Sequence, residues 1–405
     1  MTDALLDDVT QATADFLLSR EAQRACAGLT SNDLSAGRTL ATLLRLRGEF
    51  SGEEAGAILT LARLRLRAAS KFPDAERMYF TPEALEQATA WPVALHRAEW
   101  IHRNAPSGSV LDLGCGIGGD TLALATYRRV IAFEKDPIRV QFASANARAT
   151  GREDRIEFRN ADWTSELAAS KLPMASAAFV DPSRRIDGRR VFSLQETVPP
   201  LSELLRLREQ IPNLAVKVMP SVKDAEIPAG CGVEFVSHAG VCKEAVLWFG
   251  AFADHTRWAS VHAGGGWCKL VAGEDRPPLG ALQPGFFLYE PDPAVIRAGA
   301  FSELCALLDA GLVDPHIAYL VSPVRVETQF ASAFHILEVH PYNLRRLNAR
   351  LRELGISEVE LKKRGAPFEP ESLRPRLKLP AYGSAGVVFF TRIGSTPTMI
   401  IAQRA

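Results

Sequence analysis

The sequence has 405 residues, among them 47 Lys or Arg and 47 Asp or Glu, and 47% of its residues are apolar. At roughly 100 to 200 residues per domain, this length predicts two or three domains, and the composition excludes disordered, collagen-like and fibrous proteins. The formal net charge of +0 provides no overall field that would draw the chain onto nucleic acid or a membrane. Any site for a polyanion must therefore be local.

The cysteines and the N-terminus exclude further classes of protein. The six cysteines show no Cys-x-x-Cys pair and no zinc-type spacing to histidines, so we expect reduced thiols and no metal site. Residues Met1 to Leu18 carry acidic side chains and lack the basic start and the apolar run of a signal peptide. No apolar stretch approaches the roughly 18 to 20 residues that cross a bilayer. We therefore expect a cytoplasmic protein with no membrane partner.

The first hundred or so residues predict helices, because apolar positions recur at spacings of three and four. Ser51-x-x-Glu54 has the pattern of a capping box, and Thr81-Pro82 has the pattern of a second helix start. Pro106-Ser107-Gly108 then interrupts the helical pattern. The sequence predicts a helical N-terminal domain over residues 1–104.

The next segment alternates short apolar runs with helical stretches, which is typical of a parallel sheet covered by helices. The strands predicted for this sheet are residues 110–113, 130–133, 156–158, 177–180 and 214–218. Two later pairs of apolar runs predict antiparallel neighbours, and the second pair flanks the turn Gly264-Gly265-Gly266. We expect an α/β domain over residues 105–275, a doubly wound sheet that ends in antiparallel strands.

A Pro- and Gly-rich linker around Arg276-Pro277-Pro278 precedes a third predicted domain, residues 280–405. Residues 284–340 hold two basic and seven acidic side chains, net −5, whereas residues 341–405 hold twelve basic and five acidic, net +7. The basic residues of the second segment include Arg345, Arg346, Arg350 and Arg352, at helical spacing, and Lys362, Lys363 and Arg364. They either track a phosphate backbone or pair with nearby glutamates.

The most informative string is a glycine-rich turn between the first strand and the following helix. Gly114, Gly116 and Gly119 match the dinucleotide pattern G-x-G-x-x-G. Asp112, Gly114, Gly116 and Gly118 match the pattern D-x-G-x-G-x-G equally well. In either register the turn lets the backbone approach a ligand at a helix N-terminus.

Asp112 favours the second register. Its carboxylate would repel a pyrophosphate but would hold the cationic amino group of an amino-acid moiety, and S-adenosylmethionine has that group and no phosphate. Glu134 follows Gly114 by about 20 residues and suits a ribose diol. After the third strand, Asp162 suits the adenine amino group, and Trp163 either stacks there or packs in the core.

With these residues in order, residues 109–250 resemble a class I S-adenosylmethionine-dependent methyltransferase. The resemblance implies a Rossmann-like sheet, S-adenosylmethionine as the cofactor, and methyl transfer as the activity. The cofactor-binding residues that it implies are Asp112, Gly114, Gly116 and Gly118 at the methionine end, Glu134 at the ribose and Asp162 at the adenine.

The acceptor side is predicted after the fourth strand, at Asp181-Pro182-Ser183-Arg184. This string resembles the Asp-Pro-Pro motif of nitrogen methyltransferases, and most closely the Asp-Pro-Pro-Arg form of some RNA guanine methyltransferases. Ser183 departs from that motif, and Arg184 stands where amino methyltransferases carry an aromatic. We expect in-line transfer to a nitrogen, with Asp181 or the Pro182 carbonyl accepting its hydrogen bond.

Four arginines lie within seven residues after Asp181: Arg184, Arg185, Arg189 and Arg190. Such a cluster suits phosphates, and we assign substrate binding to the first two; the alternative is a solvated loop with Asp181 capping a helix. On the fifth strand, Lys217 is either internal or at the end of the sheet; a solvent-facing position explains it adequately, so it is not predicted to belong to the site.

Three strings of the third domain resemble the THUMP-like domain found behind a methyltransferase domain in one bacterial family. They are Phe287 to Gly299, Leu361 to Gly365 and Gly386 to Arg392. The resemblance implies an RNA-associated methyltransferase with an α+β C-terminal domain that presents the substrate, and hence RNA as a partner.

Three other functions remain open from the sequence. The first alternative is a methyltransferase for a small molecule or a protein side chain, in which the arginines bind a carboxylate or phosphate. The second is a non-catalytic RNA-binding protein that keeps the fold and the cofactor, for which Ser183 is the hint. An oxidoreductase that uses the dinucleotide register comes last. The modified base, the methylated atom and the oligomeric state stay open at this stage.

Overall fold

The structure is a computed structural model that describes residues 9–186, 189–191 and 193–405, without the side chains of Arg185, Ile186 and Arg190. The chain forms two compact units. The first unit holds the described residues up to Val218 together with Val222–Cys231 and Leu247–Asp254, and the second holds Met219–Ser221, Gly232–Val246 and His255–Ala405. The predicted domain limits near residues 104 and 280 stay a prediction.

The N-terminal residues are helical, as predicted. Their helices are α1 (Gln11–Leu17), α2 (Arg20–Ala27), α3 (Thr39–Leu46), α4 (Gly52–Ala68), α5 (Pro82–Gln87) and α6 (Trp91–Asn104). The capping box is present at the start of α4, where the Ser51 hydroxyl and the Glu54 carboxylate each accept a backbone N–H. Thr81 likewise caps α5, with Pro82 at its first position. Both local patterns therefore predicted a helix start correctly.

These helices share one hydrophobic core with the segment that follows them. Phe80 and Ile58 are fully buried in the same cluster as Phe142, which lies on helix α8 (Pro137–Ala149). A buried amide adds polar contacts, since Asn146 of α8 exchanges hydrogen bonds with the backbone N–H and carbonyl of Tyr79, at 2.7 and 3.1 Å. The helical segment is thus packed directly onto α8.

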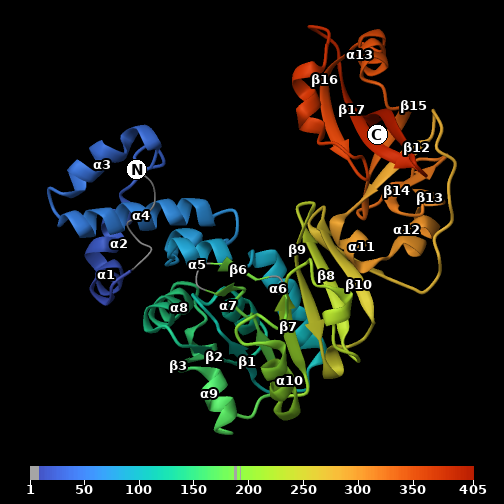
Figure 1. Cartoon of the computed structure of the whole chain (residues 1–405). Coiled ribbons are helices and arrows are strands. Elements are labelled where there is room, and N and C mark those ends of the chain that lie inside the picture. The colour runs from blue at the N-terminus through green and yellow to red at the C-terminus, as the bar shows by residue number, and fades with distance from the viewer. Residues whose placement is uncertain (1–8, 187–188, 192) are drawn as a thin grey trace. The chain divides into compact units, whose positions relative to one another are not determined.

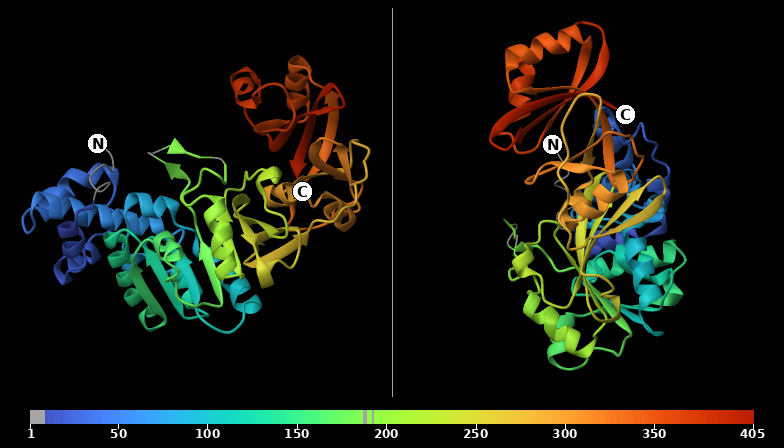
Figure 2. Two further views of the ribbon diagram at one scale, coloured as in Figure 1. Left: turned by 60° about the horizontal axis from the view of Figure 1, so that its bottom comes forward. Right: turned by 90° about the vertical axis from the view of Figure 1, so that its right-hand side faces the viewer.

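The α/β part alternates strands and helices in the predicted order. Its elements are β1 (Val110–Leu113), α7 (Gly119–Ala125), β2 (Val130–Glu134), α8, β3 (Ile156–Asn160), α9 (Trp163–Ala168), β4 (Ala177–Val180), α10 (Leu201–Gln210) and β7 (Leu214–Val218). The strands β1, β2, β3, β4 and β7 pair in parallel. All four residues of β1 are buried, as expected for a strand covered on both faces, and α8 and α10 lie on opposite faces of the sheet (Figure 2).

Four further strands extend this sheet. They are β8 (Gly232–His238), β9 (Val241–Trp248), β10 (Arg257–Ala263) and β11 (Gly266–Val271). The order in the sheet is β11-β10-β8-β9-β7-β4-β1-β2-β3 (Figure 1). β10 and β11 form the predicted hairpin, with Gly264 and Gly265 at positive φ, but β10 pairs in parallel with β8. This end of the sheet therefore combines parallel and antiparallel strand pairs, whereas only antiparallel pairs were predicted.

The C-terminal part is a second sheet with helices. Its elements are β12 (Phe287–Pro291), α11 (Pro293–Ala298), α12 (Phe301–Leu308), β13 (Gly311–Asp314), β14 (Ile317–Ser322), β15 (Ala331–Pro341), α13 (Leu344–Glu353), β16 (Ile356–Lys363), β17 (Ser384–Ile393) and β18 (Thr396–Arg404). Successive residues of β17 enter different cores, because side chains alternate along a strand. Phe389 joins one core and Phe390 another, which also holds Leu351 of α13. This part is α+β, as predicted.

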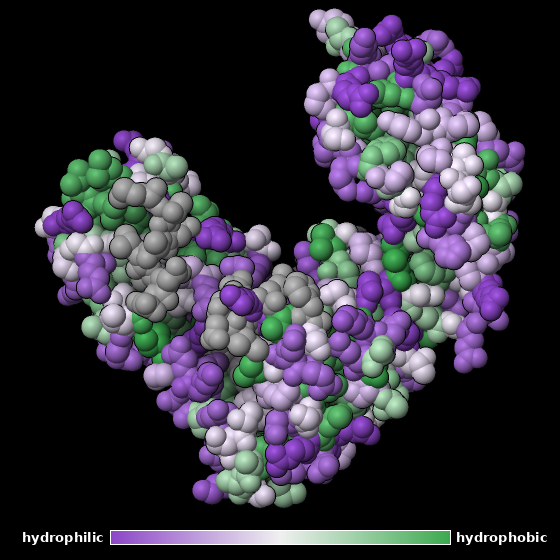
Figure 3. Space-filling model, viewed as in Figure 1, coloured by the Kyte–Doolittle hydropathy of each residue, from purple (hydrophilic) through white to green (hydrophobic). Residues whose placement is uncertain are grey.

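The face of the molecule seen in Figure 3 is mostly polar, and apolar side chains gather over the N-terminal helices on it. Leu40 and Leu44 of α3, one of these helices, are 71% and 60% exposed. Within residues 9–186, 189–191 and 193–405, no helix is both long enough and apolar enough to span a membrane.

Candidate functional site

The glycine turn between β1 and α7 has one clear register. Gly114, Gly116 and Gly118 have φ of +94°, +57° and +89°, a region that residues with a Cβ rarely adopt. Gly119 is instead the first residue of α7, behind Gly118 as N-cap. The three glycines that require positive φ are those of D-x-G-x-G-x-G, so the backbone fits this pattern.

Glu134, the last residue of β2, supports the turn. Its two carboxylate oxygens accept hydrogen bonds from the backbone N–H groups of Gly116 and Asp136, each at 3.0 Å. Only 8% of Glu134 is exposed. Glu134, which is predicted to bind the ribose, therefore lies directly beside the glycine turn.

Asp112 is buried inside the turn, with 1% of the residue exposed, and it accepts a hydrogen bond from the Thr121 hydroxyl. Burial raises the pKa of this carboxyl to about 7, and the negative charge of Asp120 adds to the effect. A cation beside Asp112 would oppose both causes. The site thus holds a carboxyl whose charge depends strongly on what lies next to it.

Asp162 lies in a different environment, at the N-cap of α9. It is exposed and accepts hydrogen bonds from the Thr164 backbone N–H at 2.9 Å and from the Thr164 hydroxyl at 2.7 Å. The hydroxyl contact is the main cause that lowers the pKa of Asp162. Trp163 is 6% exposed, so it packs in the core rather than presenting a free ring for stacking.

Asp181 follows β4 at the same edge of the sheet as Asp112. β1 and β4 are parallel and in register, with Leu113 opposite Val180. A Cβ built on Gly114 would lie 4.0 Å from the Asp181 carbonyl oxygen, which shows how closely the two turns approach. The structure therefore brings the predicted cofactor turn and the predicted acceptor residue together.

Lys217 of β7, which the sequence analysis explained by a solvent-facing position and left out of the site, is buried and contacts Asp181. Its Nζ donates to Asp181 Oδ2 at 2.6 Å and to the Thr89 hydroxyl at 3.0 Å, and 9% of the residue is exposed. A signal existed in the sequence, because a lysine within a buried apolar strand requires a polar partner. That partner, Asp181, is on the adjacent strand's end.

The segment after Asp181 is a loop and a short hairpin, with Pro182 buried. Among the described residues no helix begins here, so the alternative in which Asp181 caps a helix is wrong. The hairpin pairs β5 (Arg185–Ile186) with β6 (Arg189–Arg190), and Arg185 stands directly opposite Arg190. Arg184 is half-buried and Arg189 is exposed. The side chain of Arg185, predicted to bind substrate, lies outside what the structure describes.

The basic helix predicted near the C-terminus is α13. Arg345, Arg346 and Arg352 are exposed on it, whereas Arg350 forms ion pairs with Glu338 and Glu353. Pairing with glutamates is thus present for Arg350, and the binding of a phosphate backbone stays a prediction. Beyond α13, ion pairs engage two more of the basic residues: Lys362 with Glu290 and Glu360, and Lys363 with Glu369.

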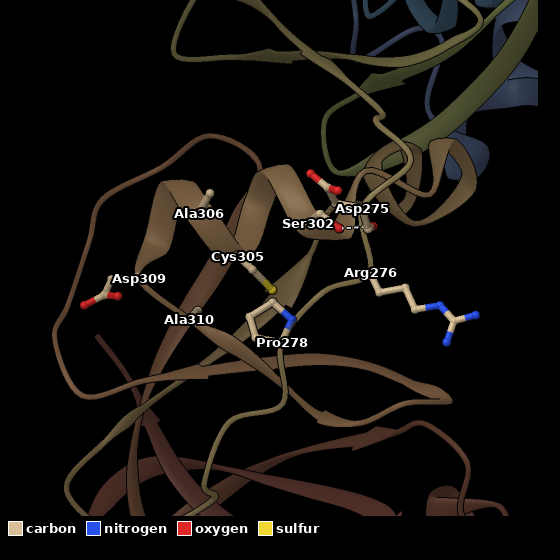
Figure 4. Close-up of a pocket in the computed structure, with 8 residues that line it drawn as sticks. All are labelled: Asp275, Arg276, Pro278, Ser302, Cys305, Ala306, Asp309 and Ala310. Atoms are coloured by element: carbon tan, nitrogen blue, oxygen red, sulfur yellow. Dashed lines mark hydrogen bonds between the residues drawn. The ribbon is translucent and has the colours of Figure 1, made fainter.

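A hollow of about 480 Å³ lies in the second unit (Figure 4). Its lining residues are Asp275, Arg276, Pro278, Ser302, Cys305, Ala306, Asp309 and Ala310. The Arg276 side chain extends away from Cys305 and Pro278 (Figure 4). None of the predicted site residues lines this hollow. Among the residues described, no cluster of His, Cys, Asp and Glu has metal-binding form.

Comparisons with known proteins address the same two regions. The family model of RNA cap guanine-N2 methyltransferases matches residues 107–189, and the THUMP domain-like model matches residues 331–404. Two proteins from strains of Mycobacterium tuberculosis, both described as uncharacterized S-adenosylmethionine-dependent methyltransferases, are 33% identical over 365 residues, 86% of this chain and 96% of each relative. A crystal structure from Porphyromonas gingivalis, described as a methyltransferase, has a TM-score of 0.73 at 17% identity and covers 96% of this chain and 98% of that chain. The last likeness shows a shared fold.

Proposed function

Since the chain belongs to the S-adenosylmethionine-dependent methyltransferases with a C-terminal THUMP-like domain, we propose that it methylates a nitrogen of an RNA base. Its cofactor is S-adenosylmethionine, which supplies a methyl group on a sulfonium centre. The observation that carries the proposal is the position of Asp181, which lies against the glycine turn and is held there by Lys217.

The residues around the turn fit this cofactor. The buried Asp112 carboxyl would gain from a cationic amino group, which favours its ionised form. Gly114 and Gly116 have no side chain to obstruct a ligand at the turn. Each oxygen of Glu134 accepts one backbone N–H and retains a further acceptor position for a ribose hydroxyl. We assign Asp162 to the adenine end, where its exposed carboxylate is accessible.

Asp181 and Pro182 are the acceptor-side residues in this proposal. The Asp181 carboxylate, or the Pro182 carbonyl, accepts a hydrogen bond from the N–H of the acceptor nitrogen and directs its lone pair at the methyl group. The sulfonium is already a good leaving group, so orienting the nitrogen contributes more than proton transfer. The displacement forms the new nitrogen–carbon bond as the sulfur–carbon bond breaks, and the nitrogen then releases its proton to solvent.

Three observations support RNA as the acceptor. The match to the cap guanine-N2 methyltransferase model covers both the glycine turn and Asp181. The segment behind Asp181 carries four arginines within seven residues, residue types that suit phosphate groups. On α13, exposed arginines provide further groups that suit a phosphate backbone. We assign Arg184 and Arg185 to contacts with RNA phosphates.

A labelled transfer assay tests the proposal. The full chain is incubated with radiolabelled S-adenosylmethionine and either unmodified total RNA or total protein, and the product nucleoside is identified by mass. We expect label in RNA on a base nitrogen; label confined to protein or to small molecules would overturn the RNA assignment. Asp181→Ala is expected to abolish transfer with near-unchanged cofactor affinity, and charge reversal at Arg184 and Arg185 is expected to raise the KM for RNA.

A further inference from the structure

Five polar side chains form a continuous chain of contacts that ends at Asp181. Arg97 of α6 is ion-paired with Asp120 of α7, and the Thr89 hydroxyl donates to Asp120 Oδ2 at 3.2 Å. Lys217 Nζ donates to the Thr89 oxygen at 3.0 Å and to Asp181 Oδ2 at 2.6 Å. Thr89 lies in the loop between α5 and α6, Lys217 lies on β7, and Asp181 directly follows β4.

The direction of each hydrogen bond in this chain is fixed by chemistry. A hydroxyl has one proton, and Thr89 gives it to the Asp120 carboxylate, so its lone pairs face the Lys217 ammonium. The ammonium can only donate, and it therefore requires acceptors on its other side as well. Asp181 provides one. Thr89 is 7% exposed and Arg97 is 2% exposed, so water competes little for these contacts.

Because Lys217 is buried, its ammonium group has to lie where protein acceptors can contact it. A buried ammonium without partners is costly, and here two acceptors from different segments fix its location. The carboxylate of Asp181 is fixed in turn, because Oδ2 is engaged with Lys217. In the described part of the chain, Oδ1 of Asp181 has no hydrogen-bond partner. One oxygen is thus occupied by the protein, and the other is left for a donor from outside.

We infer that Lys217 is a positioning residue for Asp181, and that Thr89 makes the N-terminal helical segment part of the methyl-transfer site. This inference rests on the proposed role of Asp181. Lys217 holds the carboxylate in one orientation, with Oδ1 toward the acceptor nitrogen. Thr89 and Asp120 keep Lys217 in that place.

Two variants separate positioning from a general structural role. Lys217→Met removes the ammonium and retains an unbranched chain, and Thr89→Val removes the hydroxyl and retains the branched shape. We expect Lys217→Met to lower kcat by about 100-fold, the scale of misplacing a reacting group by about 1 Å. Thr89→Val is expected to lower kcat by about 3-fold to about 10-fold, the scale of one lost hydrogen bond. In both variants the KM for RNA and the Kd for S-adenosylmethionine should stay within about twofold.

A double-mutant cycle provides the readout that a structural role would not move. If Lys217 acts through Asp181, adding Lys217→Met to Asp181→Asn lowers kcat no further than Asp181→Asn alone. Multiplicative losses would show that Lys217 acts independently of Asp181 and would overturn the inference. Lys223→Met is the matched control, since Lys223 lies in the same unit and its side chain is 70% exposed. This variant should keep the turnover of the wild type.

The outcomes also separate this inference from the proposed function. A wild type that transfers no label to RNA overturns the proposed function, and the inference with it. If the wild type methylates RNA and Lys217→Met does so with the same kcat, the inference alone is overturned. If Lys217→Met fails to fold, calorimetry with S-adenosylmethionine will show no binding, and Thr89→Val then carries the test. A kcat for Thr89→Val equal to that of the wild type would refute the role of the N-terminal segment.

Discussion

The buried carboxyl of Asp112 makes the stability of the protein depend on pH in a direction opposite to that of most carboxylates. The pKa of this group rises from 3.8 to about 7 on folding, mainly because burial penalises its charged form. The unfolded chain ionises Asp112 from about pH 4 upward, whereas the folded protein keeps the proton until about pH 7. Asp112 therefore lowers the free energy of unfolding as pH rises through this range.

The size of the effect follows from the shift. About three pKa units at about 1.4 kcal/mol each give a total cost of about 4 kcal/mol once the folded carboxyl is ionised. Roughly half of this, about 2 kcal/mol, is lost between about pH 5.5 and about pH 8, a range in which most surface carboxylates stay ionised. Asp112→Asn keeps an acceptor for the Thr121 hydroxyl and removes the titration.

Urea unfolding of the full chain, followed by fluorescence at about pH 5.5 and about pH 8, measures this difference. We expect the wild type to lose about 2 kcal/mol more than Asp112→Asn between these two pH values. Asp162→Asn is the control, because Asp162 is exposed and its pKa is lowered, so it is ionised in both states throughout. Parallel pH dependences of the wild type and Asp112→Asn would refute the reasoning from burial.

Three further predictions concern the turn, its support and the basic helix. Gly118→Ala should destabilise the protein by about 1 to 3 kcal/mol in urea unfolding, because residue 118 has a φ of +89° and a Cβ there would lie 3.3 Å from the Cβ of Ala143. Gly151→Ala should destabilise the protein less, because residue 151 has a φ of +67° but no atom lies within 4 Å of a Cβ built there. Equal losses of stability would exclude the Ala143 contact as a cause. Glu134→Gln replaces one acceptor oxygen with an NH₂ donor that faces a backbone N–H. Calorimetry should therefore show at least about 10-fold weaker binding of S-adenosylmethionine. Unchanged binding would remove Glu134 from the cofactor site. Replacing Arg345, Arg346 and Arg352 together by Gln should lower the salt dependence of RNA binding in filter assays by up to about two units of slope, whereas an unaltered slope would show that α13 does not contact RNA.

The features predicted correctly from the sequence are those that depend on neighbouring residues. The D-x-G-x-G-x-G pattern already indicated where positive φ is needed, because Gly114, Gly116 and Gly118 alone lack the Cβ that disfavours it. The helix starts at Ser51 and Thr81 were predicted for the same reason, since a cap acts on backbone groups three residues away. Local chemistry was sufficient for these elements.

Features that depend on distant pairing could not be predicted in this way. Lys217 lies 36 residues from Asp181 and 128 residues from Thr89 in sequence, so no local pattern links the three side chains. Likewise, the parallel pairing of β10 with β8 depends on a connection through the rest of the sheet rather than on the composition of either strand. The site was therefore predicted as separate motifs, and the contacts that join them were not.

The same contacts explain why the N-terminal helices matter to a site that was predicted without them. Asn146 of α8 holds the Tyr79 backbone and also donates to the Ile117 carbonyl at 2.9 Å, so one buried amide links the helical segment to the glycine turn. Lys217 makes a second link, through Thr89, to the acceptor side. Removing the helical segment would take the Tyr79 backbone from Asn146 and the Thr89 hydroxyl from Lys217, and it would uncover the apolar side chains of α8 that share its core. The segment thus acts on the two halves of the site, cofactor and acceptor, through two separate buried side chains.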